Sequence, residues 1–152
     1  MAHKAERGLF ELRQGRALYV TDPGSSALVA AVEGLTVDRL EQLRELGMDL
    51  RVVVTHHRGH AMGLPNGGPP SHLSIALGPA ATPASIQRLA TALRPTGHVE
   101  ARPATSAEVA GLALARLGQL LPAVVSMAPD PMRVARLLEW MSDATVLDVS
   151  AT

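Results

Sequence analysis

The chain has 152 residues, the length of one ordinary domain. Aromatic residues make up only 2% of it, which argues against stacking on bases or sugar rings as a binding mode. Fourteen Lys and Arg balance fourteen Asp and Glu without a basic run, so we expect no nucleic-acid partner. Because there is no cysteine, thiolate metal sites, thiol nucleophiles and disulfides are excluded.

Membrane association is not expected either. No apolar run approaches the roughly 18 residues needed to span a bilayer. The first residues, Met1 to Arg7, lack the apolar segment of a signal peptide. We therefore expect a cytoplasmic protein without a membrane partner.

The first part of the chain predicts a short helix followed by a strand. Residues 6–14 are typical of a helix that ends at Gly15. Ala17–Val20 is a strand, and the Pro-Gly-Ser pattern of residues 22–26 predicts a turn or loop. Ala27–Val32 is short enough for a strand and Ala-rich enough for a helix, so both remain open.

The clearest helix signal comes next. Thr36 is a natural N-cap and Gly47 a natural C-cap, and between them apolar residues recur at helical spacing at Val37, Leu40, Leu43 and Leu46. Leu50–Val54 is a buried strand. His56–Met62 predicts a short helix or turn, and the Pro/Gly-dense residues 63–71 predict a surface loop.

The second half continues with strands and helices. Leu73–Leu77 predicts a strand, Thr82–Leu93 a capped helix, and Arg94–Ala104 an irregular segment. The remaining segments are a helix over 107–117 capped by Thr105 or Ser106, a strand over 123–127, a helix over 132–141 and a strand over 146–149. Without repeats or a linker, residues 1–152 predict a single α/β domain with a mixed sheet and flanking helices.

Six segments, in this order, resemble the 3,4-dihydroxy-2-butanone 4-phosphate synthase family. Arg94-Pro-Thr-Gly-His-Val99 is similar to that family's Arg-Pro-Gly-His-Val, and Pro122-Ala-Val-Val125 is similar to its Pro-Ala-Gly-Val. The other segments are Leu9–Asp22, Val32–Leu40, Val52–Thr55 with Gly63–Pro65, and Glu108–Gly118. The resemblance covers about residues 8–149.

The resemblance implies an α/β fold and a homodimer with active sites completed across the interface. Members of the family convert ribulose 5-phosphate to formate and a four-carbon ketone phosphate for riboflavin synthesis, using magnesium. That chemistry needs carboxylates to bind the metal and move protons, and a metal to stabilise an enediolate.

The chain departs from the family at three places. Asp22-Pro-Gly-Ser-Ser-Ala27 stands where the family has an acidic loop of the form Asp-Asp-Glu-Asp-Arg-Glu-Asn-Glu-Gly-Asp. Thr105-Ser-Ala-Glu108 replaces Gly-His-Thr-Glu, whose His binds the metal, and Ser126-Met-Ala128 replaces Cys-Glu, whose Glu is catalytic. We therefore expect no cofactor, and in particular a lost magnesium site.

The same resemblance indicates where to look for a site. His98 lies in a loop similar to one that lines the family's active site, and Asp22 is the carboxylate left at the end of the first strand. We predict these two as catalytic residues; the alternatives are a loop His bound to carbonyls and a turn Asp. The predicted substrate-binding residues are Arg94, Arg102, Thr105, Ser106 and Glu108. Arginines, hydroxyls and the helix amides bind anions, whereas a helix cap with two solvated arginines is the alternative.

Three histidines, His56, His57 and His60, present a competing candidate. Positions 56 and 60 lie four residues apart and would share a helix face, the spacing of a metal pair. No carboxylate or cysteine lies near them in sequence, and Gly59 weakens the helix. We interpret them as a solvated strand exit and predict no metal ligand.

Two functions of different class follow. The first is a diverged enzyme acting on a small phosphorylated or carboxylated metabolite, such as a sugar phosphate, in a specialised biosynthetic pathway and without the family reaction. The second is a non-catalytic relative that serves as a ligand-binding or partner subunit. The parent activity in riboflavin biosynthesis is a third alternative.

Overall fold

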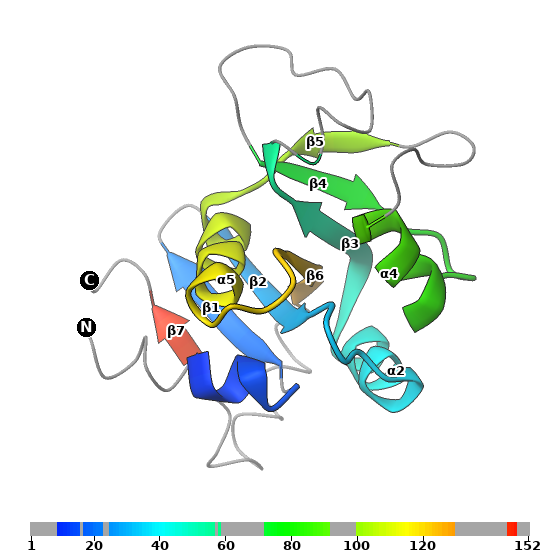
Figure 1. Ribbon diagram of the computed structural model, residues 1–152, viewed down its shortest axis with the longest axis horizontal. Helices are drawn as coiled ribbons and strands as arrows, with labels where there is room; N and C mark the ends of the chain where they lie inside the picture. Colours follow the sequence, from blue (N-terminus) through cyan, green and yellow to red (C-terminus); the bar gives the residue numbers. More distant parts are fainter. Residues whose placement is uncertain are drawn as a thin grey trace.

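One seven-stranded sheet organises the chain in the computed structural model, which describes residues 9–15, 17–22, 25–56, 58, 72–91, 100–129 and 146–148. The strand order is β5-β4-β3-β6-β2-β1-β7 (Figure 1). Pairing is antiparallel except between β1 and β7. The strands are β1 (Leu18–Asp22), β2 (Ser25–Ala31), β3 (Gly47–Val54), β4 (Leu73–Ala76), β5 (Ala101–Pro103), β6 (Ala123–Pro129) and β7 (Val146–Asp148). The predicted α/β class with a mixed sheet is confirmed.

Helices cover both faces of this sheet. The helices are α2 (Val37–Leu46), α4 (Pro83–Thr91), α5 (Ser106–Leu117) and a short helix over residues 9–13. Leu40 and Leu43 of α2 and Ile86 of α4 pack into one buried cluster, and Leu112 of α5 and Leu12 belong to a second. The sheet therefore lies between two cores, and α5 lies along β1 and β2 in Figure 1.

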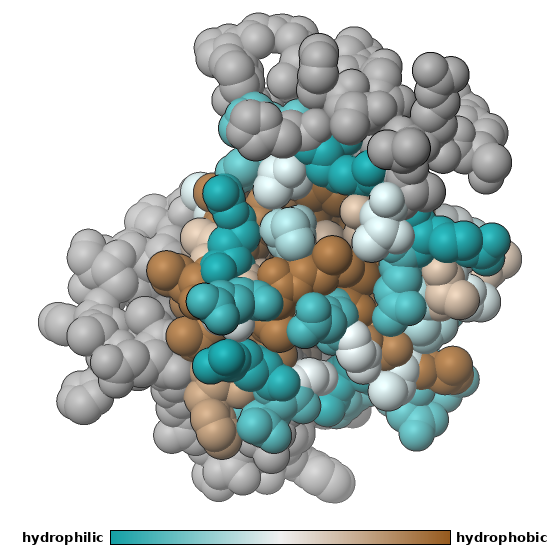
Figure 2. Space-filling view, in the orientation of Figure 1, coloured by the Kyte–Doolittle hydropathy of each residue, from teal (hydrophilic) through white to brown (hydrophobic). Residues whose placement is uncertain are grey.

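Figure 2 shows the face of the molecule on which the segment between α5 and β6 lies over the sheet. Hydrophobic residues gather in the middle of that face, where the segment between α5 and β6 runs, and hydrophilic residues lie around them. In this segment Leu120 and Leu121 are half-buried, and each packs against one of the two clusters. No helix in the described part of the chain is long and apolar enough to cross a membrane.

Most predicted elements are confirmed, including the helix capped by Thr36, whose hydroxyl accepts from the Arg39 N–H at 3.1 Å. The open segment 27–32 is a strand, β2. Two predictions of irregular structure are wrong in part. Residues 101–103 form edge strand β5 against β4, and Asp22 lies opposite Ser25 in the β1–β2 ladder. An edge strand tolerates the proline that had suggested a loop. The predicted elements over 59–71, 92–99 and 132–141 lie outside the described residues.

Gly47 is the C-cap of α2, as predicted. Its φ of −156° is extended, and its N–H bonds the Leu43 carbonyl as the chain passes directly into β3. A Cβ at this position would lie 2.5 Å from the Ala128 carbonyl oxygen of β6. The glycine is needed because the two strands approach closely here.

Candidate functional site

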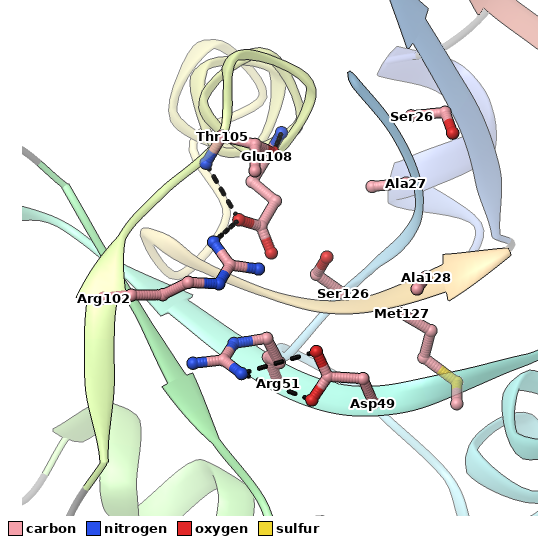
Figure 3. Close-up of a pocket in the computed structure, with 10 residues that line it drawn as sticks. All are labelled: Ser26, Ala27, Asp49, Arg51, Arg102, Thr105, Glu108, Ser126, Met127 and Ala128. Carbon is pink, nitrogen blue, oxygen red and sulfur yellow. Dashed lines mark hydrogen bonds and ion pairs between the residues drawn. The ribbon is translucent and has the colours of Figure 1, made fainter. Parts of the chain in front are cut away.

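A small polar pocket lies on the α5 face of the sheet, beside the first turn of that helix. The cavity measures about 50 Å³ and opens to solvent. It is bounded by parts of β2, β3, β5, β6 and α5, as Figure 3 shows. The lining residues are Ser26, Ala27, Asp49, Arg51, Arg102, Thr105, Glu108, Ser126, Met127 and Ala128.

Strand register explains why polar side chains collect here. Val53 and Val124 are opposite one another and belong to the cluster beneath α5. Side chains two residues along a strand share a face, so Arg51 and Ser126, which are also opposite one another, continue that face. Ser74 of β4 lies opposite Val53 and joins the same face. The apolar core under α5 thus gives way to a polar floor.

Glu108 is the centre of the hydrogen-bond network, and its side chain is only 2% exposed. Its Oε1 accepts from the Thr105 N–H and from Arg102 Nη1, each at 2.9 Å, and its Oε2 accepts from the Ser74 hydroxyl at 3.1 Å. The Thr105 hydroxyl accepts from the Glu108 N–H, which completes a capping box. Both carboxylate oxygens are therefore occupied.

The electrostatics of Glu108 follow from these contacts. Burial by itself would raise the pKa of the carboxyl group. Hydrogen bonds from the Thr105 N–H, Ser126 and Arg102, together with the charge of Arg102, outweigh burial and hold the pKa below its usual value. Glu108 is thus kept ionised, which suits a carboxylate that positions an arginine and does not suit a proton donor.

Arg102 is the more exposed of the two arginines, with 39% of its side chain exposed. Its Nη1 donates to Glu108 and, at 3.0 Å, to the Pro103 carbonyl. Among the described residues, its Nε and Nη2 have no protein partner. In Figure 3 its guanidinium lies between Glu108 and the opposite wall of the pocket. Within the described part of the chain, these two nitrogens therefore remain as donors for a ligand.

Arg51 forms the other wall of the pocket, and hydrogen bonds to Ser74 hold its side chain in position. Its Nε donates to the Ser74 hydroxyl at 2.7 Å and its Nη2 donates to the Ser74 carbonyl at 3.0 Å. Its Nη1 lies 3.2 and 3.4 Å from the two carboxylate oxygens of Asp49. The Arg51 side chain is 10% exposed and that of Asp49 is 54% exposed. Two ion pairs consequently face one another across the pocket (Figure 3).

Three predicted site residues, Arg102, Thr105 and Glu108, lie together in this pocket. Ser106 lies beside them, with its hydroxyl 3.0 Å from that of Ser25. The Ser25 hydroxyl also accepts from the Ala107 N–H, and Thr105 accepts from the Glu108 N–H. These two amides at the start of α5 already have partners, so the side chains of the arginines are the better anion donors.

The structure describes little of the other predicted site residues. The backbone of Asp22 pairs with Ser25 at the end of β1, and its side chain lies outside the described part. Arg94 and His98 also lie outside the described residues. Their predicted catalytic and binding roles remain predictions.

Of the three clustered histidines, the structure describes His56; His57 and His60 lie outside the described residues. The His56 N–H donates to Nδ1 of His72 at 3.1 Å, and the two rings are 5.5 Å apart between centroids. Within the described residues, no three His, Asp or Glu side chains gather closely enough to hold a metal ion.

Sequence reasoning missed Asp49, Arg51, Ser74 and Ser126. A signal was present, since Arg51, Ser74 and Ser126 each interrupt an apolar strand and each is buried. A buried charge or hydroxyl needs a partner. Three such interruptions on neighbouring strands indicate one shared network, but the strand order needed to see this was not apparent from the sequence.

The three departures from the family pattern meet at this pocket. Ser26 and Ala27 come from the shortened first loop, Thr105 and Glu108 from the start of α5, and Ala128 from the end of β6. These segments are far apart in sequence. All three segments therefore contribute residues to the lining of this pocket.

Comparison with known proteins identifies the fold. No family model and no curated protein matches the chain. Solved structures do: a 3,4-dihydroxy-2-butanone 4-phosphate synthase in complex with two magnesium ions has 17% identity and a TM-score of 0.63, with 94% of this chain and 91% of that chain covered. The synthase from Candida albicans has 15% identity and a TM-score of 0.64, with 94% and 92% covered.

A two-domain 3,4-dihydroxy-2-butanone 4-phosphate synthase from A. baumannii has 14% identity and a TM-score of 0.67. The match covers 95% of this chain and 55% of that longer chain. The resemblance inferred from six sequence segments is thus confirmed at the level of the fold. This chain has the fold of 3,4-dihydroxy-2-butanone 4-phosphate synthase.

Proposed function

We propose that this protein binds a small phosphorylated or carboxylated metabolite in the pocket between Arg51 and Arg102, and that it does not run the magnesium-dependent reaction on ribulose 5-phosphate. The observation that supports this most directly is the convergence of the three departures on one pocket. In place of the family's acidic loop, metal-binding His and catalytic Glu, the described lining carries hydroxyls, alanines and two guanidinium groups, each paired with one carboxylate, Asp49 or Glu108.

The donor set favours an anion. A guanidinium group offers five N–H donors in a planar fork that matches a carboxylate or phosphate. Nε and Nη2 of Arg102, which have no partner among the described residues, provide such a fork, and Glu108 holds the group in place through Nη1. The Ser126 hydroxyl lies on the pocket floor, between Glu108 and Arg51 in Figure 3. A few placed polar groups in a concave site are typical of small-molecule binding.

The described lining does not fit a magnesium site. Magnesium prefers carboxylate and water oxygens in octahedral geometry. Glu108 already accepts three hydrogen bonds on its two oxygens, and Asp49 is paired with Arg51. The guanidinium groups of Arg51 and Arg102, which pair with these two carboxylates, also repel a divalent cation. This supports the proposed loss of the family's metal chemistry.

Ligand titration tests the proposal. Inorganic phosphate and a panel of small phosphorylated and carboxylated compounds are titrated into labelled protein while backbone amide shifts are recorded by NMR. We expect shifts around the pocket and at least a tenfold weaker affinity in Arg102→Met, in line with the loss of charge-assisted hydrogen bonds. Arg88→Met, an exposed arginine of α4, is the matched control and should leave affinity unchanged. If no compound shifts pocket amides, the proposal is wrong.

A non-catalytic ligand-binding or partner subunit is the second candidate. The engagement of both Glu108 oxygens supports it, because a carboxylate held in this way is a poor acid or base. Turnover of any bound compound separates the two candidates. Under the enzyme hypothesis, His98→Ala abolishes turnover while binding through Arg102 persists; unchanged turnover removes His98 from the role.

A further inference from the structure

Asp49 occupies an unusual position in β3. Its φ is +59°, a left-handed conformation that few residues other than glycine adopt, although Asp and Asn tolerate it best. The register between β3 and β6 shifts between Met48 and Arg51, so Asp49 lies in a β-bulge. Bulges often redirect a side chain beside a functional site. Here the bulge turns the Asp49 carboxylate toward Arg51 at the pocket.

The two ion pairs of the pocket differ in how firmly their carboxylates are held. Glu108 is buried and accepts from three groups in addition to its contact with Ser126. Asp49 is 54% exposed, and within the described residues its side chain contacts only Nη1 of Arg51, at 3.2 and 3.4 Å. An incoming anion can therefore replace the Asp49 carboxylate at its arginine more readily than it can replace Glu108.

Arg51 has contacts that keep its guanidinium group in position when an anion replaces Asp49. Two of its nitrogens donate to Ser74, one to the hydroxyl and one to the carbonyl. These contacts do not involve Asp49, so the guanidinium group stays in the wall of the pocket when the carboxylate leaves. Its Nη1 then faces the same space as the free donors of Arg102.

We propose that Asp49 is a built-in competitor for the ligand: its carboxylate occupies Nη1 of Arg51 until an incoming anion displaces it. This rests on the proposed anion-binding function of the pocket. Asp49 consequently sets a selectivity threshold, since a ligand must engage Arg51 more strongly than a tethered carboxylate does. A weakly anionic or neutral compound of the same shape leaves the pair intact.

Phosphate affinity in matched variants tests this competition. Asp49→Asn removes the charge and keeps a residue that accepts the left-handed backbone. We expect inorganic phosphate to bind roughly fivefold more tightly, the scale of an exposed ion pair. Asp38→Asn makes the same chemical change on exposed α2, away from the pocket, and should leave the affinity unchanged. In an Arg51→Lys background, the gain from Asp49→Asn should disappear.

Each outcome decides a different point. If wild type binds phosphate and Asp49→Asn binds it equally or more weakly, Asp49 does not compete and the inference is overturned. If Asp49→Asn and Asp38→Asn raise the phosphate affinity equally, the effect comes from the general change in charge. That result also overturns the inferred competition by Asp49. If neither wild type nor Asp49→Asn binds phosphate and no compound of the panel binds either, both this inference and the proposed function fail.

Discussion

Ser74 and Glu108 connect the two walls of the pocket: the Ser74 hydroxyl donates to Oε2 of Glu108 at 3.1 Å and accepts from Nε of Arg51 at 2.7 Å. Because the hydroxyl has one hydrogen, these two contacts fix its orientation. Ser74 is fully buried, so water does not replace either contact. Arg51 and the capping carboxylate of α5 are thereby held in one arrangement.

We expect Ser74→Ala to destabilise the fold by about 1–3 kcal/mol, because a buried carboxylate oxygen and a buried N–H each lose a partner. Urea unfolding followed by circular dichroism measures the change. Ser26→Ala is the control: Ser26 is exposed and its side chain has no hydrogen bond within the described residues, so its loss should change the free energy of unfolding by less than about 0.5 kcal/mol. Equal effects of the two substitutions would contradict the linking role of Ser74.

The lowered pKa of Glu108 predicts that the free energy of unfolding decreases in acid. Its pKa in the folded protein lies below the usual glutamate value of 4.5, so the unfolded chain binds more protons just below that pH. The contribution of Glu108 is thus present above pH 4.5 and is lost as pH falls through the lower, folded pKa. Glu108→Gln should cost about 1.5–3 kcal/mol at neutral pH and flatten the loss of stability below pH 4.5.

Unfolding free energies at a series of pH values from neutral to acid measure this difference. Glu41→Gln, at an exposed position of α2, is the matched control and should retain the wild-type slope. A wild-type slope in Glu108→Gln as well would show that Glu108 does not contribute to the acid dependence.

Gly47→Ala should disturb the contact between β3 and β6 beside the pocket. The added Cβ would lie 2.5 Å from the Ala128 carbonyl oxygen, and backbone cannot yield as a flexible side chain can. We expect a cost of about 1–3 kcal/mol, the usual range for overpacking. Gly78→Ala, where an added Cβ meets nothing within 4 Å, is the control. Thermal unfolding compares them, and equal melting temperatures would disprove the close approach.

Local sequence signals were sufficient for most of the fold. Helix α2 was predictable because Thr36, the apolar spacing and Gly47 all indicate the same boundaries. Edge strand β5 was not, because three residues containing a proline carry almost no periodic signal and depend on pairing with β4. The sequence could not decide between helix and strand for 27–32, and burial between β1 and β6 decided for strand.

The site was predicted less completely than the fold. Side-chain chemistry and capping led to Arg102, Thr105 and Glu108, which lie together at the pocket because β5 runs almost directly into the capped start of α5. Asp49 and Arg51 were missed, since their meeting with that segment depends on strand order and on a bulge that alternation cannot reveal. The homodimer, the cytoplasmic location and the roles of Asp22, Arg94 and His98 stay predictions.

The central claim is that this pocket binds an anion without running the family reaction. One NMR sample of the protein with ribulose 5-phosphate and magnesium tests both parts, because protein amide shifts and the formate proton signal are read together. We predict that amides around Arg51 and Arg102 shift and that no formate accumulates beyond a protein-free control. Formate that appears steadily, requires magnesium and grows with protein concentration would contradict the account.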